Sequence, residues 1–432
     1  MKIAILGYGL EGESSFKYWS QDSSNEITIF DQKTPDRAIP AGIPTVFGEK
    51  YLDNLNGYDL LIRTSGLDKN KIKTDGKVWS ATNEVFSKCP AEIIGVTGTK
   101  GKGTTASLIA SIFESAGRKV WLTGNIGDVL LKDLKDIKPT DIVVYELSSF
   151  QLWDIERSPH VAVVTIIEPE HLNVHVDFAD YVNAKANIRR FQKSDDICFY
   201  HPSNESSKYI AQCTNQGKAI RYGIADDGGV YDKDGYFCQD EHKICSLDSL
   251  QLVGHHNIEN ACAAISVAKS YDLTDENIEN GLKKFVGLPH RIEFVKELNG
   301  VKYYNDSFSA STPAVVAAMK SFSGPEILII GGVDRGGDFN NIADNIANNG
   351  NVKAVVIIGE IRHKLADIVN SKNPKAIIKV TDLKTMPEIV SLANSFTEPG
   401  DTVILSPGCG SFDMFKDFYD RGNQFKEVVN NL

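Results

Sequence analysis

Cysteine is sparse in this sequence and shows no pairing pattern. Only seven of the 432 residues are cysteine, an odd number, and none forms a Cys-x-x-Cys pair. A disulfide framework or a structural zinc site needs paired, closely spaced cysteines. The scattered cysteines exclude both and favour a reducing compartment, so we expect a cytoplasmic protein.

The sequence also lacks long apolar runs and an excess of positive charge. No stretch approaches the ~20 apolar residues of a membrane-spanning helix, and the apolar N-terminal run is too short for a signal peptide. Forty-six Lys and Arg residues oppose 57 Asp and Glu residues, which gives a net charge of −11 and repels nucleic acid and anionic membranes. We therefore expect neither as a partner, and any polyanionic ligand must be bound by a local positive group.

What the sequence does contain is a regular alternation of short apolar runs and amphipathic stretches. This alternation is typical of α/β proteins with parallel sheets. A length of 432 residues suggests about three domains at roughly 100–200 residues each. Loops at Lys88–Ala91 and Gly287–His290 give the predicted boundaries 1–88, 89–287 and 288–432. Residues 204–248 are expected to form loops and β-hairpins.

The clearest motif is the glycine-rich segment Gly95–Thr105, which follows the expected strand Ile93–Val96 and opens a helix. Glycines let backbone N–H groups surround phosphate oxygens, and Lys102 supplies a charge for the β- and γ-phosphates. The strict pattern has glycine where Val96 stands and Ser or Thr where Gly103 stands. The segment predicts a triphosphate-binding loop, with a glycine-rich turn that binds no nucleotide as the alternative.

Polar side chains follow two further expected strands. Glu146 ends the strand that begins at Ile142, and His171 follows the apolar run Val161–Ile167. Ligands of open α/β sheets gather at the carboxyl ends of strands, where a carboxylate can bind Mg²⁺. Taken singly, an acidic residue at a strand end is more often a solvated cap, and a lone histidine is more often a packing or surface residue.

The N-terminus carries a second glycine motif, Gly7-x-Gly9-x-x-Gly12, after the expected strand Lys2–Leu6. Asp31 lies about 20 residues further on, at the end of the next strand, as in dinucleotide-binding folds. Taken alone, this pattern indicates an NAD-binding domain.

Taken together, these elements resemble the Mur ligase superfamily, the ATP-dependent amide ligases of peptidoglycan precursor and folyl-polyglutamate synthesis. The resemblance covers nearly the whole chain, because further motifs fall in the family's order: Gly124-Asn125-Ile-Gly127, Gly254-His-His-Asn257-Ile-Glu-Asn260-Ala, Leu288-Pro-His-Arg291-Ile-Glu293 and Asn305-Asp306-Ser307. It implies a Rossmann-like N-terminal domain that binds a UDP-sugar instead of NAD. It also implies a central P-loop ATPase-type parallel sheet and a Rossmann-like C-terminal domain that binds glutamate.

Three segments are similar to the branch of the family that adds glutamate, D-glutamate being favoured, to UDP-N-acetylmuramoyl-L-alanine: Gly7–Gly12, Glu146–Gln151 and Leu405–Asp413 with Phe415 and Phe418. The resemblance implies ligation through an acyl phosphate by a monomer that uses ATP and two Mg²⁺ ions.

The resemblance also implies roles for individual residues. The catalytic set is Lys102, Glu146, His171, Lys185, Arg291 and Asp306, and the metal ligands are Thr104, Glu146, His171 and a carbamylated Lys185. ATP is assigned to Gly98, Thr99, Lys100, Gly101, Lys102, Gly103, Thr104, Thr105, Asn257, Arg291 and Asp306. The UDP-sugar is assigned to Leu10, Glu11, Asp31, Thr64, Gly66, Asn125 and Ser148, and glutamate to Arg335, Ser411, Phe412 and Phe418.

Departures from the family pattern concentrate in the amino-acid site. Phe308 stands where the family has lysine and cannot replace a cation, whereas Arg335 can still bind a glutamate carboxylate with two hydrogen bonds. The choice between D- and L-glutamate therefore stays open. A folyl-polyglutamate-synthase-like ligase, a non-catalytic nucleotide-binding protein and a P-loop ATPase without amino-acid dependence are the remaining alternatives.

Overall fold

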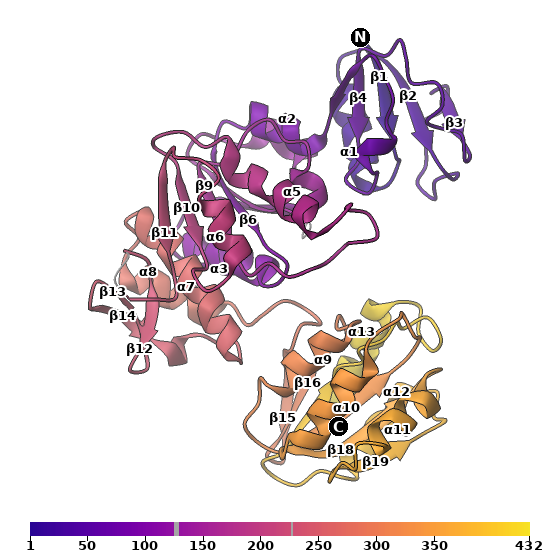
Figure 1. Ribbon diagram of the computed structural model, residues 1–432, viewed down its shortest axis with the longest axis vertical. Helices are drawn as coiled ribbons and strands as arrows, with labels where there is room; N and C mark the ends of the chain where they lie inside the picture. Colours follow the sequence, from indigo (N-terminus) through magenta and orange to yellow (C-terminus); the bar gives the residue numbers. More distant parts are fainter. Residues whose placement is uncertain (125–128, 226–227) are drawn as a thin grey trace. The chain divides into compact units, whose positions relative to one another are not determined.

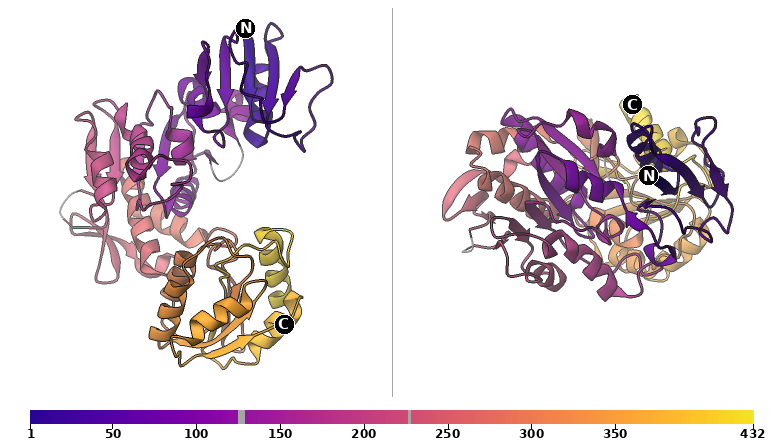
Figure 2. Two further views of the ribbon diagram at one scale, coloured as in Figure 1. Left: turned by 45° about the vertical axis from the view of Figure 1, so that its right-hand side comes forward. Right: turned by 90° about the horizontal axis from the view of Figure 1, so that it is seen from above.

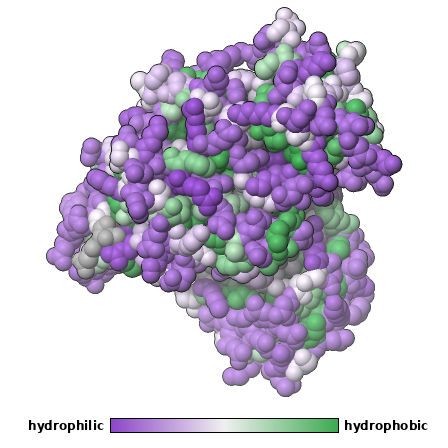
Figure 3. Space-filling view, turned by 45° about the horizontal axis from the view of Figure 1, so that its top comes forward, coloured by the Kyte–Doolittle hydropathy of each residue, from purple (hydrophilic) through white to green (hydrophobic). Residues whose placement is uncertain are grey.

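The computed structural model describes residues 1–124, 129–225 and 228–432. These residues form two compact units, one of residues 1–250 with 258–285 and the other of residues 251–257 with 286–432. Three mainly parallel sheets with helical connections confirm the predicted α/β class (Figures 1 and 2). Polar side chains predominate on the face drawn in Figure 3.

The first sheet occupies the N-terminal part of the first unit and is entirely parallel, in the order β3-β2-β1-β4-β5. Its elements are β1 (Lys2–Leu6), α1 (Leu10–Trp19), β2 (Glu26–Asp31), β3 (Thr45–Phe47), β4 (Leu60–Arg63), η1 (Lys69–Lys71), β5 (Lys77–Trp79) and α2 (Ala81–Lys88). Residues 3–6 of the central strand are fully buried, as expected for a parallel strand covered on both faces.

The second sheet is also parallel and has the order β11-β10-β9-β6-β8-β7. Its strands are β6 (Glu92–Thr97), β7 (Val120–Gly124), β8 (Ile142–Glu146), β9 (Val161–Val164), β10 (Ile197–Tyr200) and β11 (Lys218–Arg221). The helices of this region are α3 (Lys102–Ser115), η2 (Leu130–Asp136), α4 (Ser149–Leu152), α5 (Phe178–Arg190), α6 (Glu205–Ala211), α7 (His255–Ser270) and α8 (Asp275–Lys284). Because β6 lies between β8 and β9, the segments that follow these three strands meet at one edge.

The expectation for residues 204–248 is only partly correct. The predicted hairpins exist as the antiparallel sheet of β12 (Tyr231–Lys233), β13 (Tyr236–Gln239) and β14 (His242–Ser246), followed by η3 (Leu247–Ser249). The same segment also contains α6 and β11, which the sequence pattern missed. Helix α6 is seven residues long, and β11 is a half-exposed edge strand, so neither gives a strong hydrophobic period.

The second unit contains the sheet β15-β16-β20-β17-β18-β19, in which only β15 is antiparallel. Its elements are β15 (Glu293–Leu298), β16 (Val301–Asn305), α9 (Thr312–Met319), β17 (Glu326–Gly331), α10 (Phe339–Asn348), β18 (Val352–Ile358), α11 (Arg362–Asn370), β19 (Ile377–Val380), α12 (Met386–Asn394), β20 (Thr402–Leu405) and α13 (Phe418–Asn430). Alternate residues of β17 and β18 enter two separate cores, one with α9, α10 and α11 and the other with α12 and α13.

The predicted boundaries at residues 88 and 287 fall between sheets, after α2 and before β15. Packing assigns Gln251–Asn257 to the second unit, so the exact boundaries stay a prediction. Across the described ranges, the structure contains no helix with the length and apolar character that crossing a membrane requires.

Candidate active site

The predicted phosphate loop connects β6 to α3 and has a backbone that needs glycine. Gly98 has φ 152°, and Gly101, the N-cap of α3, has φ 86°. A Cβ at Gly98 would overlap Thr165 Oγ1, and one at Gly101 would overlap Asn260 Oδ1. The loop therefore follows a path that side chains would block, and it leads directly into the N-terminus of a 14-residue helix, where backbone N–H groups favour an anion.

Neighbouring segments hold this loop in place. The backbone N–H of Thr99 donates to Ile166 O at 2.7 Å, and Thr165 Oγ1 donates to Lys100 O at 2.6 Å. The Thr99 hydroxyl lies 2.9 Å from the Tyr181 hydroxyl of α5. The loop is thus fixed by contacts from the segment after β9 and from α5.

Lys185 is a buried lysine beneath the phosphate loop. Its side chain on α5 is 1% exposed, and Nζ donates to Gly98 O at 2.8 Å. Nζ also lies 4.6 Å from the centre of the Tyr181 ring. Burial, reinforced by the charge of Lys102, holds the pKa of Lys185 well below its usual value. The amine is therefore readily neutral, the form that acts as a nucleophile.

The structure brings Lys102, Glu146, His171 and Lys185 to one edge of the central sheet. Glu146 is buried at the end of β8, opposite Val96 of β6. The pKa of His171 is lowered by burial and by the charges of Lys185 and Lys102. Lys102 Nζ donates to Thr99 O at 3.0 Å, and Thr104 lies in the first turn of α3. Among described residues, no three His, Cys, Asp or Glu side chains are arranged to hold a metal ion.

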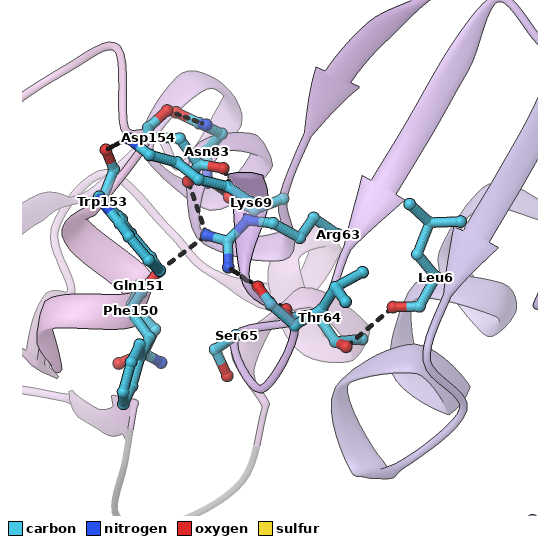
Figure 4. Close-up of polar contacts among 12 residues, drawn as sticks. Leu6, Arg63, Thr64, Ser65, Lys69, Asn83, Phe150, Gln151, Trp153 and Asp154 are labelled. Carbon is cyan, nitrogen blue, oxygen red and sulfur yellow. Dashed lines mark hydrogen bonds and ion pairs between the residues drawn. The ribbon is translucent and has the colours of Figure 1, made fainter. Parts of the chain in front are cut away.

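Five of the residues predicted to bind a UDP-sugar lie around the carboxyl end of the N-terminal sheet: Leu10, Glu11, Asp31, Thr64 and Gly66. A Cβ at Gly7 would overlap Thr64 Oγ1, which donates to Leu6 O at 2.8 Å (Figure 4). The Glu11 carboxylate accepts hydrogen bonds from Ser65 N and Ser65 Oγ, both at 2.8 Å. The glycine turn and the loop that contains Gly66 therefore pack directly against each other.

The other residues predicted to contact the sugar lie in different surroundings. Asp31 accepts a hydrogen bond from Tyr8 N at 2.7 Å, which fixes the glycine turn, and Leu10 is exposed. Ser148 caps α4 by accepting a hydrogen bond from Gln151 N at 3.2 Å. Asn125 lies outside the described residues.

In the second unit, Asp306 and Arg291 flank the carboxyl end of β16. The buried Asp306 carboxylate accepts hydrogen bonds from Ser406 Oγ at 2.7 Å and from Ile292 N at 3.2 Å. Burial raises the pKa of Asp306 to about 7. The Arg291 guanidinium carbon lies 3.8 Å from the centre of the Phe308 ring. Phe308 lacks a charge of its own but holds a cation against its face.

The predicted glutamate-binding residues border the turn after β20. Val333 and Gly410 form an isolated antiparallel bridge, which places Arg335 against Gly410, next to the buried Ser411. The Phe418 ring contacts Phe308 edge-on, with centroids 5.0 Å apart. Phe412 is 68% exposed. Asn257 is the last residue of the segment Gln251–Asn257 of the same unit, and its Nδ2 donates to Val253 O at 2.7 Å.

Sequence reasoning missed Arg421, a buried residue of α13 that organises this turn. Its Nε donates to Ser307 Oγ at 2.9 Å, and Nη2 donates to Ser307 O at 2.8 Å. Nη1 reaches Cys409 O at 3.3 Å. Arg421 therefore joins the Asp306-Ser307 motif to the turn that carries Ser411. An arginine in an amphipathic C-terminal helix resembles a surface residue, so nothing in the surrounding sequence indicates that Arg421 is buried.

Two family models match the chain, "Mur ligase middle domain" over residues 96–268 and "Mur ligase, glutamate ligase domain" over residues 290–409. UDP-N-acetylmuramoylalanine--D-glutamate ligases of Acetivibrio thermocellus and Clostridium kluyveri are 37% and 35% identical, over 100% of this chain and 96% and 97% of theirs. The crystal structure of MurF ligase from Thermotoga maritima in complex with ADP has a TM-score of 0.63 at 16% identity, over 99% of this chain and 94% of that one.

The phosphate loop and the full-length relatives together define an ATP-dependent amide ligase. The chain belongs to the Mur ligase family.

Proposed function

We propose that this chain is a UDP-N-acetylmuramoylalanine–D-glutamate ligase that acts in peptidoglycan precursor synthesis. One observation carries the proposal. A glycine-dependent phosphate loop, with Lys185 buried against it, lies in a chain whose relatives of this activity match over its full length. A ligase that takes L-glutamate instead is the second candidate. Phe308 stands where the family has lysine and lies against Phe418, so the amino-acid site departs from the family pattern.

The proposed reaction begins when the carboxylate of the UDP-sugar's alanine attacks the γ-phosphorus of ATP. A new C(O)O–P bond forms as the bond to the β-phosphate oxygen breaks, giving an acyl phosphate and ADP. The glutamate amine then attacks the acyl carbon, loses a proton and expels inorganic phosphate. Both first reactants are anionic, so Lys102 and Arg291 are proposed to offset their repulsion and hold them in line.

Two Mg²⁺ ions are proposed at the edge that carries Glu146, His171, Thr104 and Lys185. The buried carboxylate of Glu146 is a hard oxygen donor of the kind that Mg²⁺ prefers. Lys185 fits this role after carbamylation, in which its neutral amine adds CO₂ and releases a proton to become an anionic oxygen donor. Bound Mg²⁺ would supply charge neutralisation for the phosphates. The low pKa of Lys185 supports the modification.

Arg335 is proposed to bind a glutamate carboxylate with two hydrogen bonds, beside Ser411, Phe412 and Phe418. Its position against Gly410 supports this role. Glu11, Asp31, Leu10, Thr64, Gly66, Asn125 and Ser148 are proposed for the UDP-sugar. We further propose a monomer that acts in the cytoplasm.

Phosphate release from ATP and Mg²⁺ with UDP-N-acetylmuramoyl-L-alanine tests the proposal when D-glutamate, L-glutamate and no amino acid are compared. Mass spectrometry of the product should show addition of one glutamate, and the isomer that stimulates release decides between the two candidates. ATP turnover without amino-acid dependence would instead identify an ATPase, and absence of turnover would identify a non-catalytic nucleotide-binding protein. Stimulation only by a folate substrate would favour a folyl-polyglutamate synthase.

A further inference from the structure

A fully buried arginine, Arg63, reaches from the N-terminal sheet to the segment Phe150–Asp154 of the central region (Figure 4). It ends β4, immediately before the predicted sugar-binding residue Thr64. The apolar core on one face of the N-terminal sheet continues through η2 into the central sheet, so both sheets belong to one unit. Arginine is rarely buried without a complete set of partners, so the partners of Arg63 indicate its role.

The Arg63 guanidinium donates five hydrogen bonds, three of them across this junction and two to the loop that follows Arg63. Nε and Nη2 bind the two carboxylate oxygens of Asp154 at 2.7 and 2.8 Å, and Nη2 also donates to Phe150 O at 2.8 Å. Nη1 donates to Thr64 O at 3.3 Å and to Leu67 O at 3.1 Å. Arginine has five N–H donors in a planar fork, so the number of hydrogen bonds equals the number of donors. Lysine cannot make the same hydrogen bonds.

The residues on both sides of Arg63 are themselves fixed. Asp154 and Glu156 of the central region are held by Asn83 of α2, whose Nδ2 donates to Asp154 O at 2.9 Å and whose Oδ1 accepts from Glu156 N at 2.9 Å. On the N-terminal side, Glu11 holds Ser65 through two hydrogen bonds. Arg63 therefore joins two hydrogen-bonded segments, and Asn83 joins the same regions.

The segment bound by Arg63 leads to the predicted catalytic edge. The ring of Phe150 lies 4.9 Å from that of His171 and stacks at 5.4 Å on His175. Lys69 adds a further contact across the same junction, because its Nζ donates to Trp153 O at 3.1 Å. A short chain of contacts thus runs from the Thr64 loop through Arg63 and Phe150 to His171.

We propose that Arg63 is a positioning residue for the nucleotide-sugar substrate. By fixing the loop of Thr64–Leu67 against Phe150–Asp154, it directs the carboxylate of a sugar held by the N-terminal sheet toward the phosphate loop. The inference rests on the proposed function. The hydrogen bonds of Arg63 go to Thr64, Leu67, Phe150 and Asp154, all outside the phosphate loop, so its loss should affect the sugar substrate and not ATP.

The test uses the full chain with Arg63→Lys, Asp154→Asn and the double variant. Steady-state kinetics gives KM for UDP-N-acetylmuramoyl-L-alanine and for ATP, and calorimetry gives the Kd of UDP alone. We expect the KM for UDP-N-acetylmuramoyl-L-alanine and the Kd of UDP to rise about 10-fold or more, while the KM of ATP changes less than about 2-fold. Because each substitution breaks the same pair, the double variant should be no worse than the more impaired single variant.

Arg189→Lys is the matched control. Arg189 is also buried, but its acceptors, Gln192 Oε1, Ala211 O and Gly217 O, all lie within the central region. It should lower the thermal unfolding temperature and leave the ratio of the two KM values unchanged.

Several results would overturn the inference. Equal changes in both KM values, an unchanged Kd for UDP, or additive effects of the two substitutions would each show that Arg63 serves stability alone. If the wild type binds UDP but does not ligate, the proposed function fails, and the calorimetric comparison still decides the role of Arg63. A wild type with no affinity for UDP would overturn both the proposed function and the inference about Arg63.

Discussion

Glu326 of the second unit allows a quantitative prediction of how stability depends on pH, because its carboxyl group is buried. It begins β17 between β18 and β20, is 0% exposed, and neither oxygen has a hydrogen-bond partner among the described residues. Burial raises the pKa of Glu326 to about 8. The folded unit therefore keeps the proton over a pH range in which the unfolded chain has lost it.

The sign and size of the effect follow from proton linkage. Between the unfolded pKa of about 4.5 and the folded value of about 8, the folded state binds one more proton, so stability falls as pH rises. Each pH unit in this window lowers the free energy of unfolding by about 1.4 kcal/mol, which amounts to about 3 kcal/mol at pH 7. Glu326→Gln cannot ionise and should remove this loss, making the unit more stable than the wild type at pH 7 and equally stable near pH 4.5.

Hydrogen exchange of the β17 and β18 amides, followed by mass spectrometry between pH 5 and 8, measures this effect. The method is chosen because Trp19, Trp79, Trp121 and Trp153 all lie in the first unit, so tryptophan fluorescence would report the wrong region. Glu427→Gln, at an exposed position of α13, is the control and should follow the wild type. An identical pH dependence for wild type and Glu326→Gln would refute the reasoning.

Four further outcomes are expected. Lys102→Ala should lower kcat roughly 10²–10³-fold or more in the phosphate-release assay, because a charge facing the transferred phosphate is lost; a value near wild type would remove Lys102 from the mechanism. Lys185→Ala should lose ligation and recover part of it with added formate or acetate, whereas full activity without them would exclude a carbamate. Arg335→Ala should raise the KM of glutamate far more than that of ATP, and equal effects would argue against glutamate binding. Gly101→Ala should destabilise the loop by about 1–2 kcal/mol in thermal unfolding, because Gly101 has a positive φ and a Cβ there would overlap Asn260; an unchanged unfolding temperature would contradict this packing.

Local sequence was sufficient for much of the fold. The strand at Lys2–Leu6 has the predicted bounds, because a continuous apolar run marks a strand that is buried on both faces. The weaker elements α6 and β11 were missed, since a short helix and an exposed edge strand depend on neighbours for their stability.

Local sequence also determined the phosphate loop and the strand-end residues. Glycine is required at positions 98 and 101 by backbone conformation, and that requirement is visible in the chain itself. The placement of Glu146 and His171 at one edge follows from a general property of parallel sheets. These features could be predicted because each depends on a few consecutive residues.

Only the tertiary structure decided which charged residues are buried and what they join. Arg63 and Arg421 have no local signal, because their side-chain acceptors, Asp154 and Ser307, lie 91 and 114 residues away in the sequence. The low pKa of Lys185 and the raised pKa values of Asp306 and Glu326 likewise arise from burial, to which distant segments contribute. The sequence by itself determined the strands, the glycine turns and the order of the motifs. Folding determined the electrostatics, because desolvation depends on every segment that packs around a charge.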